Sequence, residues 1–185
     1  MTTDRMFAFI GGAEGPWRVE KVQSVKGETL VKPARVKVTG GLVVEAPDSL
    51  WTLRGFTSNQ RYTTQAENKE LVAVQEGLNR PEATCAALIP MRKTAEWWAM
   101  SQDQRRAIFE QQSKHIEIGL RYLPAIARRL HHSRDLGEPF DFITWFEFAP
   151  TQIGAFEELL HKLRTSPEWD YVDREVDIRL VRGVA

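Results

Sequence analysis

A change of residue pattern partway along the chain is the feature that most constrains its fold. Up to residue 56, short runs rich in β-branched and aromatic residues are separated by Gly, Pro and Asp, which is typical of strands. We expect strands at residues 7–10, 17–25, 34–38, 42–45 and 50–56. From residue 94 to residue 129, good helix formers replace the strand signals. The sequence therefore predicts a mixed α and β chain.

The elements expected after residue 63 refine this prediction. A capping-box pattern at Thr64–Glu67 predicts a helix that ends near residue 79. We then expect a strand at 84–90, helix over 94–129, a strand at 140–148, a helix from Pro150 and a strand at 176–181. Pro124 marks a break, beyond which 125–131 is expected to continue as helix. This order predicts an α+β half in which helices cover one face of an antiparallel sheet.

The region before residue 84 resembles a degenerate copy of that half, with more strand and less helix, although no repeat is visible in the residues themselves. We therefore expect two halves, 1–83 and 84–185, that share one sheet system.

Charge, cysteine content and hydropathy narrow the functional classes. Lys plus Arg and Asp plus Glu are both 25, so the formal net charge is zero and nucleic acid is not an expected partner. A chain with little net charge can also self-associate. The single cysteine, Cys85, is expected to be a buried core thiol. The apolar run at 7–10 is too short for a signal peptide or a membrane span, so we expect a cytoplasmic protein.

The four histidines include no HExxH pair, so the zinc reading is weak. His131 and His132 are adjacent and are expected to be solvated at a helix end, with His161 also on a helix. His115 differs because its helical face carries apolar residues and Gly119, whose missing Cβ allows a flat group to approach. A lone histidine on an apolar face is nevertheless more often a core residue, so the pattern alone leaves both readings open.

Several longer motifs carry a resemblance to a known family. They are SNQRYT at 58–63, IPMRKTAEWW at 89–98, SKHIEIGLRYLPAIARRLHHSRDL at 113–136 and FDFITWFE at 140–147. Together they closely resemble chlorite dismutases, in particular the compact branch of that family. The resemblance implies two ferredoxin-like halves of the dimeric α/β-barrel type, with antiparallel sheets, helices packed outside and reduced helices in the N-terminal half. It also implies one haem b, which is iron protoporphyrin IX, bound by the C-terminal half.

The resemblance further implies decomposition of chlorite to chloride and dioxygen, with the O–O bond formed at a histidine-ligated iron. His115 would be the proximal iron ligand, and Glu168 would accept the hydrogen bond of its other ring nitrogen. Arg128 would be the distal arginine, a permanent positive charge beside the anion. Without the resemblance, we would expect Arg128 to belong to an exposed cluster at a helix end and Glu168 to be a solvated carboxylate.

Five further positions follow from the same resemblance. Lys93 would pair with a haem propionate, assisted by Asn59 and Tyr62. Trp97 would pack beside the porphyrin, and Leu123 would form part of the distal wall.

Related functions stay open to different degrees. Coprohaem decarboxylases carry a tyrosine where this chain has Ile89, and they lack the distal arginine, so chlorite chemistry is favoured over decarboxylation. A haem peroxidase or a haem-binding protein of the same superfamily is the alternative. A haem store and a structural ferredoxin-like dimer belong to a non-enzyme class, and failure to bind haem would favour the structural dimer. The short N-terminal half favours a homodimer over a pentamer.

Overall fold

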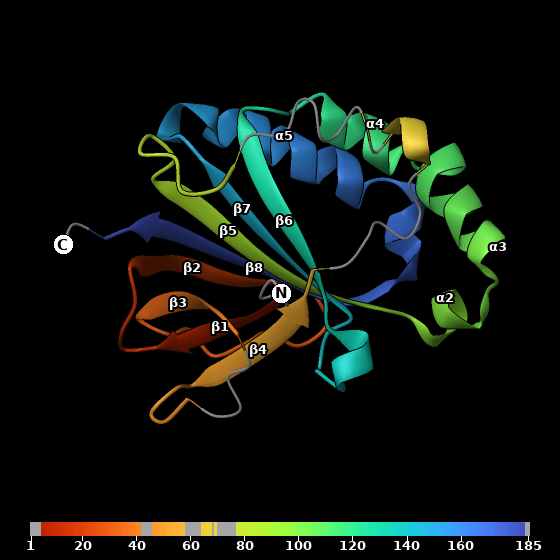
Figure 1. The fold of residues 1–185 in the computed structure, drawn as a ribbon. Coiled ribbons are helices and arrows are strands. Elements are labelled where there is room, and N and C mark those ends of the chain that lie inside the picture. The colour runs from red at the N-terminus through yellow and green to blue at the C-terminus, as the bar shows by residue number, and fades with distance from the viewer. Residues whose placement is uncertain (1–4, 42–45, 58–63, 68, 70–76, 184–185) are drawn as a thin grey trace.

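The strands form one closed barrel in which neighbouring strands are antiparallel. The computed structural model describes residues 5–41, 46–57, 64–67, 69 and 77–183. Within these residues the strand order around the barrel is β1-β3-β2-β8-β5-β7-β6-β4 (Figure 1). The strands are β1 Met6–Gly12, β2 Trp17–Lys26, β3 Arg35–Gly40, β4 Trp51–Phe56, β5 Cys85–Lys93, β6 Ile126–His132, β7 Phe142–Phe148 and β8 Val172–Arg182. The expectation of one shared sheet system is confirmed.

The barrel contains the same strand order twice. The first four strands lie in the order β4-β1-β3-β2, and the last four lie in the order β8-β5-β7-β6. In each set the fourth strand neighbours the first, and the third lies between the first and the second, which is the ferredoxin-like arrangement. The α+β fold class is therefore confirmed, whereas the boundary between halves 1–83 and 84–185 stays a prediction.

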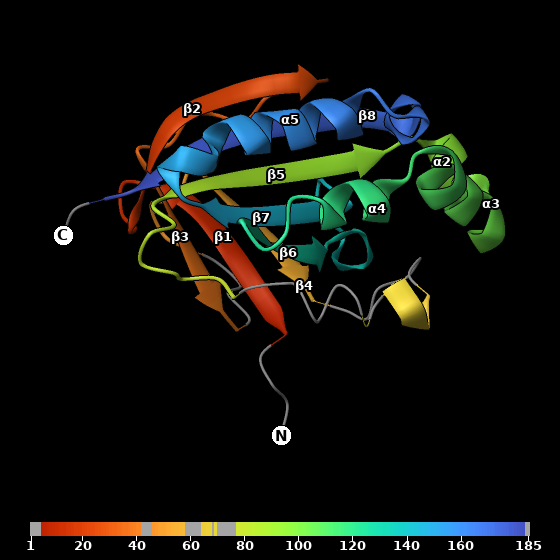
Figure 2. The same ribbon diagram turned by 90° about the horizontal axis from the view of Figure 1, so that it is seen from above.

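The described helices lie mainly in the second half, outside the barrel (Figures 1 and 2). They are α2 Ala95–Ala99, α3 Gln102–Arg106, the π-helix η1 Ala107–Gln112, α4 His115–Leu120, α5 Ile153–Arg164 and the short 3-10 helices η2 Arg134–Leu136, η3 Pro150–Gln152 and η4 Pro167–Tyr171. Helices α4 and α5 extend across the outer face of the C-terminal strands. No helix among the described residues is long and apolar enough to cross a membrane.

Two apolar clusters lie on opposite faces of the C-terminal strands. Phe9, Leu53 and Trp145 belong to the cluster inside the barrel. Phe146 and Phe156 belong to the cluster that joins the outer face to α5. Cys85 lies in this second cluster, 8% exposed, which confirms the expected buried thiol.

The helix expected at 125–131 is wrong, because this segment is strand β6. It pairs with β7 from Ile126 opposite Phe148 to His132 opposite Phe142. The apolar–polar alternation typical of a strand is hard to recognise in this segment, because both faces of β6 meet the interior of the protein and each carries polar as well as apolar residues. His131 is 0% exposed and His132 is 6% exposed, so the expectation of solvated helix-end histidines is also wrong.

Most of the other expected elements are confirmed at shifted boundaries. The strands expected near residues 7, 17, 34, 50, 84, 140 and 176 are present. So is the helix expected from Pro150, which follows a 3-10 turn. The strand expected at 42–45 and most of the helix expected after Thr64 lie outside the described residues, although 65–67 and 69 are helical.

Candidate active site

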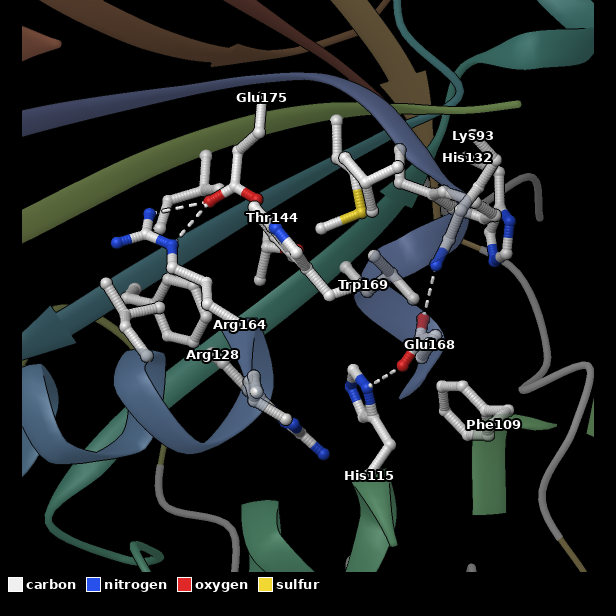
Figure 3. A pocket seen from close by; sticks show the side chains of 18 of the residues that line it. Lys93, Phe109, His115, Arg128, His132, Thr144, Arg164, Glu168, Trp169 and Glu175 are labelled. Carbon is white, nitrogen blue, oxygen red and sulfur yellow. Dashed lines mark hydrogen bonds and ion pairs between the residues drawn. The ribbon is translucent and has the colours of Figure 1, made fainter. Parts of the chain in front are cut away.

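A cavity of about 360 Å³ lies between the outer face of the C-terminal strands and the helices (Figure 3). Alternate residues of each strand form its floor, as the two-residue period of a strand requires. They are Ile89, Met91 and Lys93 of β5, Arg128, Leu130 and His132 of β6, and Phe142, Thr144 and Phe146 of β7. Apart from Thr57, every lining residue comes from the second half. The volume lies within the range of pockets that hold small ligands and cofactors.

His115 enters this cavity from the first residue of α4. Lys114, just before it, has a left-handed backbone with φ 52°, which separates α4 from the preceding π-helix. Glu110 then accepts a hydrogen bond from the backbone N–H of Ile116 at 2.8 Å, which satisfies a free donor of the first helical turn. The His115 ring is stacked on Phe109, with centroids 4.3 Å apart. The imidazole is therefore held by backbone geometry and by a ring contact.

Glu168 of η4 orients the imidazole. Its Oε2 lies 2.7 Å from His115 Nδ1 (Figure 3). The backbone N–H of Glu168 donates to Ser113 Oγ at 2.9 Å. A neutral ring must donate from Nδ1 to this carboxylate, so Nε2 carries the lone pair that a metal ion can take. The structure thus brings together the predicted ligand and its predicted partner.

Lys93 completes a chain of three side chains, in which Lys93 and Glu168 are buried and His115 is half-buried. Its Nζ donates to Glu168 Oε1 at 2.6 Å, and Lys93 is 5% exposed. Burial by itself would raise the pKa of Glu168, but the charges of His115 and Lys93 and their hydrogen bonds outweigh it and lower this pKa to about 2. Sequence reasoning missed this pairing because Lys93 and Glu168 lie 75 residues apart. No local spacing indicates the contact.

Arg128 enters the same cavity from β6. A Cβ placed on Gly119 would lie 2.8 Å from Arg128 Nη1, so the guanidinium packs against the bare backbone of α4, one turn after His115. Burial lowers the pKa of Arg128, but a guanidinium stays protonated in proteins at neutral pH. The cavity therefore combines an imidazole that has a ring nitrogen available for a metal ion with a permanent positive charge.

The remaining predicted residues divide into three groups. Trp97 is 1% exposed, lines the cavity and lies under the Lys93 ammonium, with Nζ 4.5 Å from the ring centroid. Leu123 lies in the turn after α4 and is not among the lining residues of the described chain. Asn59 and Tyr62 lie outside the described residues.

The residues present fit a haem group. One imidazole over a largely apolar floor suits a metal ion that brings its other ligands with it, as iron does in a porphyrin. At Gly119 the absence of a side chain leaves a bare patch of α4 backbone, which the Arg128 guanidinium contacts. In addition, the buried carboxylate behind His115 is the kind of partner that a haem-ligating histidine uses.

Comparisons with known proteins show which proteins this chain is similar to. A family model described as chlorite dismutase matches residues 35–183. A crystal structure of dimeric chlorite dismutases from Nitrobacter winogradskyi is 51% identical, with a TM-score of 0.89, and covers 96% of this chain and 99% of that one. The chlorite dismutase of Candidatus Nitrospira defluvii, solved in complex with imidazole, has a TM-score of 0.66 at 18% identity, covering 98% of this chain and 93% of its own, and supports the fold alone.

A curated relative gives a shorter match. The chlorite dismutase of Ideonella dechloratans is 36% identical over 86 residues, which are 46% of this chain and 28% of that protein. The match thus spans less than a third of the relative's length.

Proposed function

This chain belongs to the chlorite dismutase family, and on that premise we propose that it decomposes chlorite to chloride and dioxygen at a haem b bound through His115. The observation that carries the proposal is the cavity itself, where the His115–Glu168 pair and the Arg128 guanidinium share one largely apolar space. The reaction is balanced as ClO2⁻ → Cl⁻ + O2, so it needs no external oxidant or reductant. Haem, when bound, supplies the oxygen-atom transfer chemistry.

His115 and Glu168 would hold the iron. The imidazole would donate its Nε2 lone pair, while Glu168 keeps the ring proton on Nδ1 and increases the electron density of the ring. A more electron-rich proximal ligand favours higher oxidation states of iron. This arrangement suits an oxygen-atom acceptor better than a simple haem store.

Arg128 would attract and retain the anions. Chlorite carries a negative charge, and a guanidinium in a water-poor cavity attracts it more strongly than it would in bulk water. The five N–H donors of the guanidinium can also hold a chlorine oxyanion until the O–O bond has formed. We propose this as the reason for a half-buried arginine beside the proposed haem site.

The Lys93–Glu168 contact supports a further role for Lys93 besides the propionate contact expected from sequence, which stays a prediction. Its ammonium is paired with Glu168, so we propose that Lys93 keeps this carboxylate ionised and aimed at His115. Trp97 would pack against the porphyrin edge. Propionate contacts by Asn59 and Tyr62, and a distal-wall role for Leu123, stay predictions.

Assembly and location are also proposals. The Nitrobacter winogradskyi protein is described as dimeric and matches nearly the whole chain, which supports a homodimer here. The cytoplasmic location stays a prediction from the sequence.

Ile89 lines the cavity, and its hydrocarbon side chain cannot form the oxygen radical that coprohaem decarboxylation needs.

Haem titration and an oxygen electrode test this proposal together. We expect the wild-type protein to bind haem and to release about one dioxygen per chlorite, as the balanced reaction requires. His115→Ala should lose the iron ligand and its optical signature, whereas His161→Ala, on the exposed side of α5, should keep both.

The distal charge is tested in the same assay. Arg128→Ala should bind haem but release dioxygen much more slowly, whereas Arg121→Ala, an exposed arginine just after α4, should behave as wild type. Haem binding without dioxygen release by the wild type would contradict the proposal. It would instead favour the peroxidase or haem-binding alternative, which hydrogen peroxide turnover distinguishes.

A further inference from the structure

Glu175 is a buried acid in the wall of the same cavity that the reaction described above does not use. It lies on β8 opposite Met91 of β5 and is 1% exposed. Its Oε1 accepts two hydrogen bonds from Arg164 of α5, at 3.0 Å from Nε and 2.6 Å from Nη2 (Figure 3). Its Oε2 is buried and has no hydrogen-bond partner among the described residues. The carboxyl group is therefore held from one side only.

The charges around Glu175 do not balance. Arg164 is shared with Asp177, whose Oδ2 lies 2.9 Å from Arg164 Nη2. Arg179 pairs with the same Asp177 and with Glu157. Two arginines thus face three carboxyl groups in this network, so one carboxyl can stay neutral without leaving a buried cation unpaired.

Glu175 is the member best placed to take up the proton. Burial, the largest effect, raises its pKa to about 7, and the charge of Asp177 adds to this. The Arg164 charge and hydrogen bonds act in the opposite direction, as does the more remote charge of Lys93. Asp177, in contrast, has two arginine partners, and they lower its pKa despite its burial. A buried carboxyl with one unsatisfied oxygen costs less free energy when neutral than when ionised.

We infer that Glu175 sets the charge of the cavity wall and so determines how strongly the cavity holds anions, binding them tightly when it is protonated and weakly when it is ionised. The inference rests on the proposed function, because it concerns anions beside the same haem site. With Glu175 neutral, the charges of Arg164 and Arg179 are balanced by Asp177 and Glu157, and Arg128 presents a positive charge to the cavity. With Glu175 ionised, the network carries one net negative charge, which repels an anion through the same low-dielectric wall. Glu175 is thus a positioning residue that acts on substrate through charge.

Nitrite is a suitable probe because it is a bent, singly charged anion like chlorite, and it can be titrated optically against the haem-loaded protein. Between pH 6 and pH 8 we expect its dissociation constant for the wild type to rise roughly tenfold, the order of effect of one added charge in such a wall. Glu175→Gln should lose this rise and bind at pH 8 about as tightly as the wild type does at pH 6. Glu158→Gln, an exposed acid on α5, should keep the wild-type profile.

Infrared difference spectra of the purified protein give a readout that does not depend on chlorite turnover. A protonated-carboxyl band should be present at pH 6, largely lost at pH 8 and missing from Glu175→Gln at both. Glu175→Asp, which keeps a carboxyl, should retain a shifted band and covers the case in which the Gln variant does not fold.

The inference would be overturned if Glu175→Gln kept the protonated-carboxyl band of the wild type. It would also be overturned if nitrite affinity in that variant fell tenfold between pH 6 and pH 8, as it does in the wild type. A titrating band in a protein that releases no dioxygen from chlorite would instead contradict the proposed function and leave the assignment of the proton in place.

Discussion

At the scale of single residues, the site depends on a buried carboxylate shared by two partners. Glu168 satisfies the Lys93 ammonium with one oxygen and the His115 ring with the other. Such a chain is costly to interrupt, because removal of one member leaves a charge in a place that water cannot reach. The same arrangement fixes the direction of the imidazole. Stability and the proposed iron binding are therefore coupled through one side chain.

A double-mutant cycle tests this coupling. Glu168→Gln should lower the free energy of unfolding by about 3–5 kcal/mol, because the buried Lys93 ammonium loses its counter-charge. Adding Lys93→Met should restore much of that loss, since no unpaired charge then remains. Urea unfolding of the four haem-free proteins measures both effects. Simple additivity of the two single substitutions would show that the pair does not interact as described.

At the residue scale, the sequence motifs predicted which residues share the cavity, while the roles of these residues stay predictions. His115, Glu168 and Arg128 were named from motifs, and the structure brings His115 and Glu168 into contact and places all three in one cavity. The pairing of Lys93 with Glu168 and the Arg164–Glu175 pair were not predicted. Each joins segments that meet only after the helices have folded over the sheet, so no spacing in the chain reveals them.

At the scale of elements, the close packing of α4 against β6 determines how the site is built. Gly119 provides the bare patch of helix against which the Arg128 guanidinium lies. Sequence reasoning assigned that glycine to the approach of a flat group, and it assigned the Arg128 segment to a helix. Arg128 would point in a different direction on a helix than on a strand, because side chains return to the same face every 3.6 residues in a helix and every two residues in a strand. Assigning this segment to a helix instead of a strand therefore predicts the wrong neighbours for every residue in it.

Gly119→Ala tests the contact between the two elements. The new Cβ would lie 2.8 Å from Arg128 Nη1, the end of a flexible side chain that can move away at little cost. Alanine also favours helix over glycine by about 1 kcal/mol, so the free energy of unfolding should stay the same or rise slightly. Dioxygen release should nevertheless fall severalfold, because Arg128 is displaced.

Gly154→Ala on α5 is the matched control, since its new Cβ would meet nothing within 4 Å. Wild-type turnover in Gly119→Ala would show that the position of Arg128 against α4 does not matter. Equal losses of turnover in the two variants would point to a general effect of alanine rather than to this contact.

At the scale of the whole molecule, the barrel is closed by a narrow seam between its two halves. Strands β4 and β6 are joined through one registered pair, Phe56 opposite His132, whereas β6 and β7 are paired along their length. Gly55 lets the two strands approach, because a Cβ there would lie 2.7 Å from His131 Cβ and 2.8 Å from Ser133 Oγ. The seam thus brings the first half beside the strand that carries Arg128.

Gly55→Ala should weaken this closure. Unlike Arg128 Nη1, the atoms that the new Cβ meets lie close to the backbone of β6 and cannot move independently. Overpacking of this kind costs about 1–3 kcal/mol, which urea unfolding can detect. Gly77→Ala, at an exposed position with nothing within 4 Å, should unfold as the wild type does. A Gly55→Ala protein of full stability would mean that the seam can widen without loss.

We expect one chlorite ion to supply both atoms of each dioxygen molecule released in this cavity. The most direct measurement gives the haem-loaded protein a mixture of unlabelled chlorite and chlorite carrying heavy oxygen at both positions, and determines the mass of the dioxygen released. Unlabelled and doubly labelled dioxygen should form with almost no singly labelled molecules, because the cavity is proposed to retain the chlorine oxyanion until the O–O bond forms. Abundant singly labelled dioxygen, or no dioxygen from a haem-replete protein, would contradict this expectation.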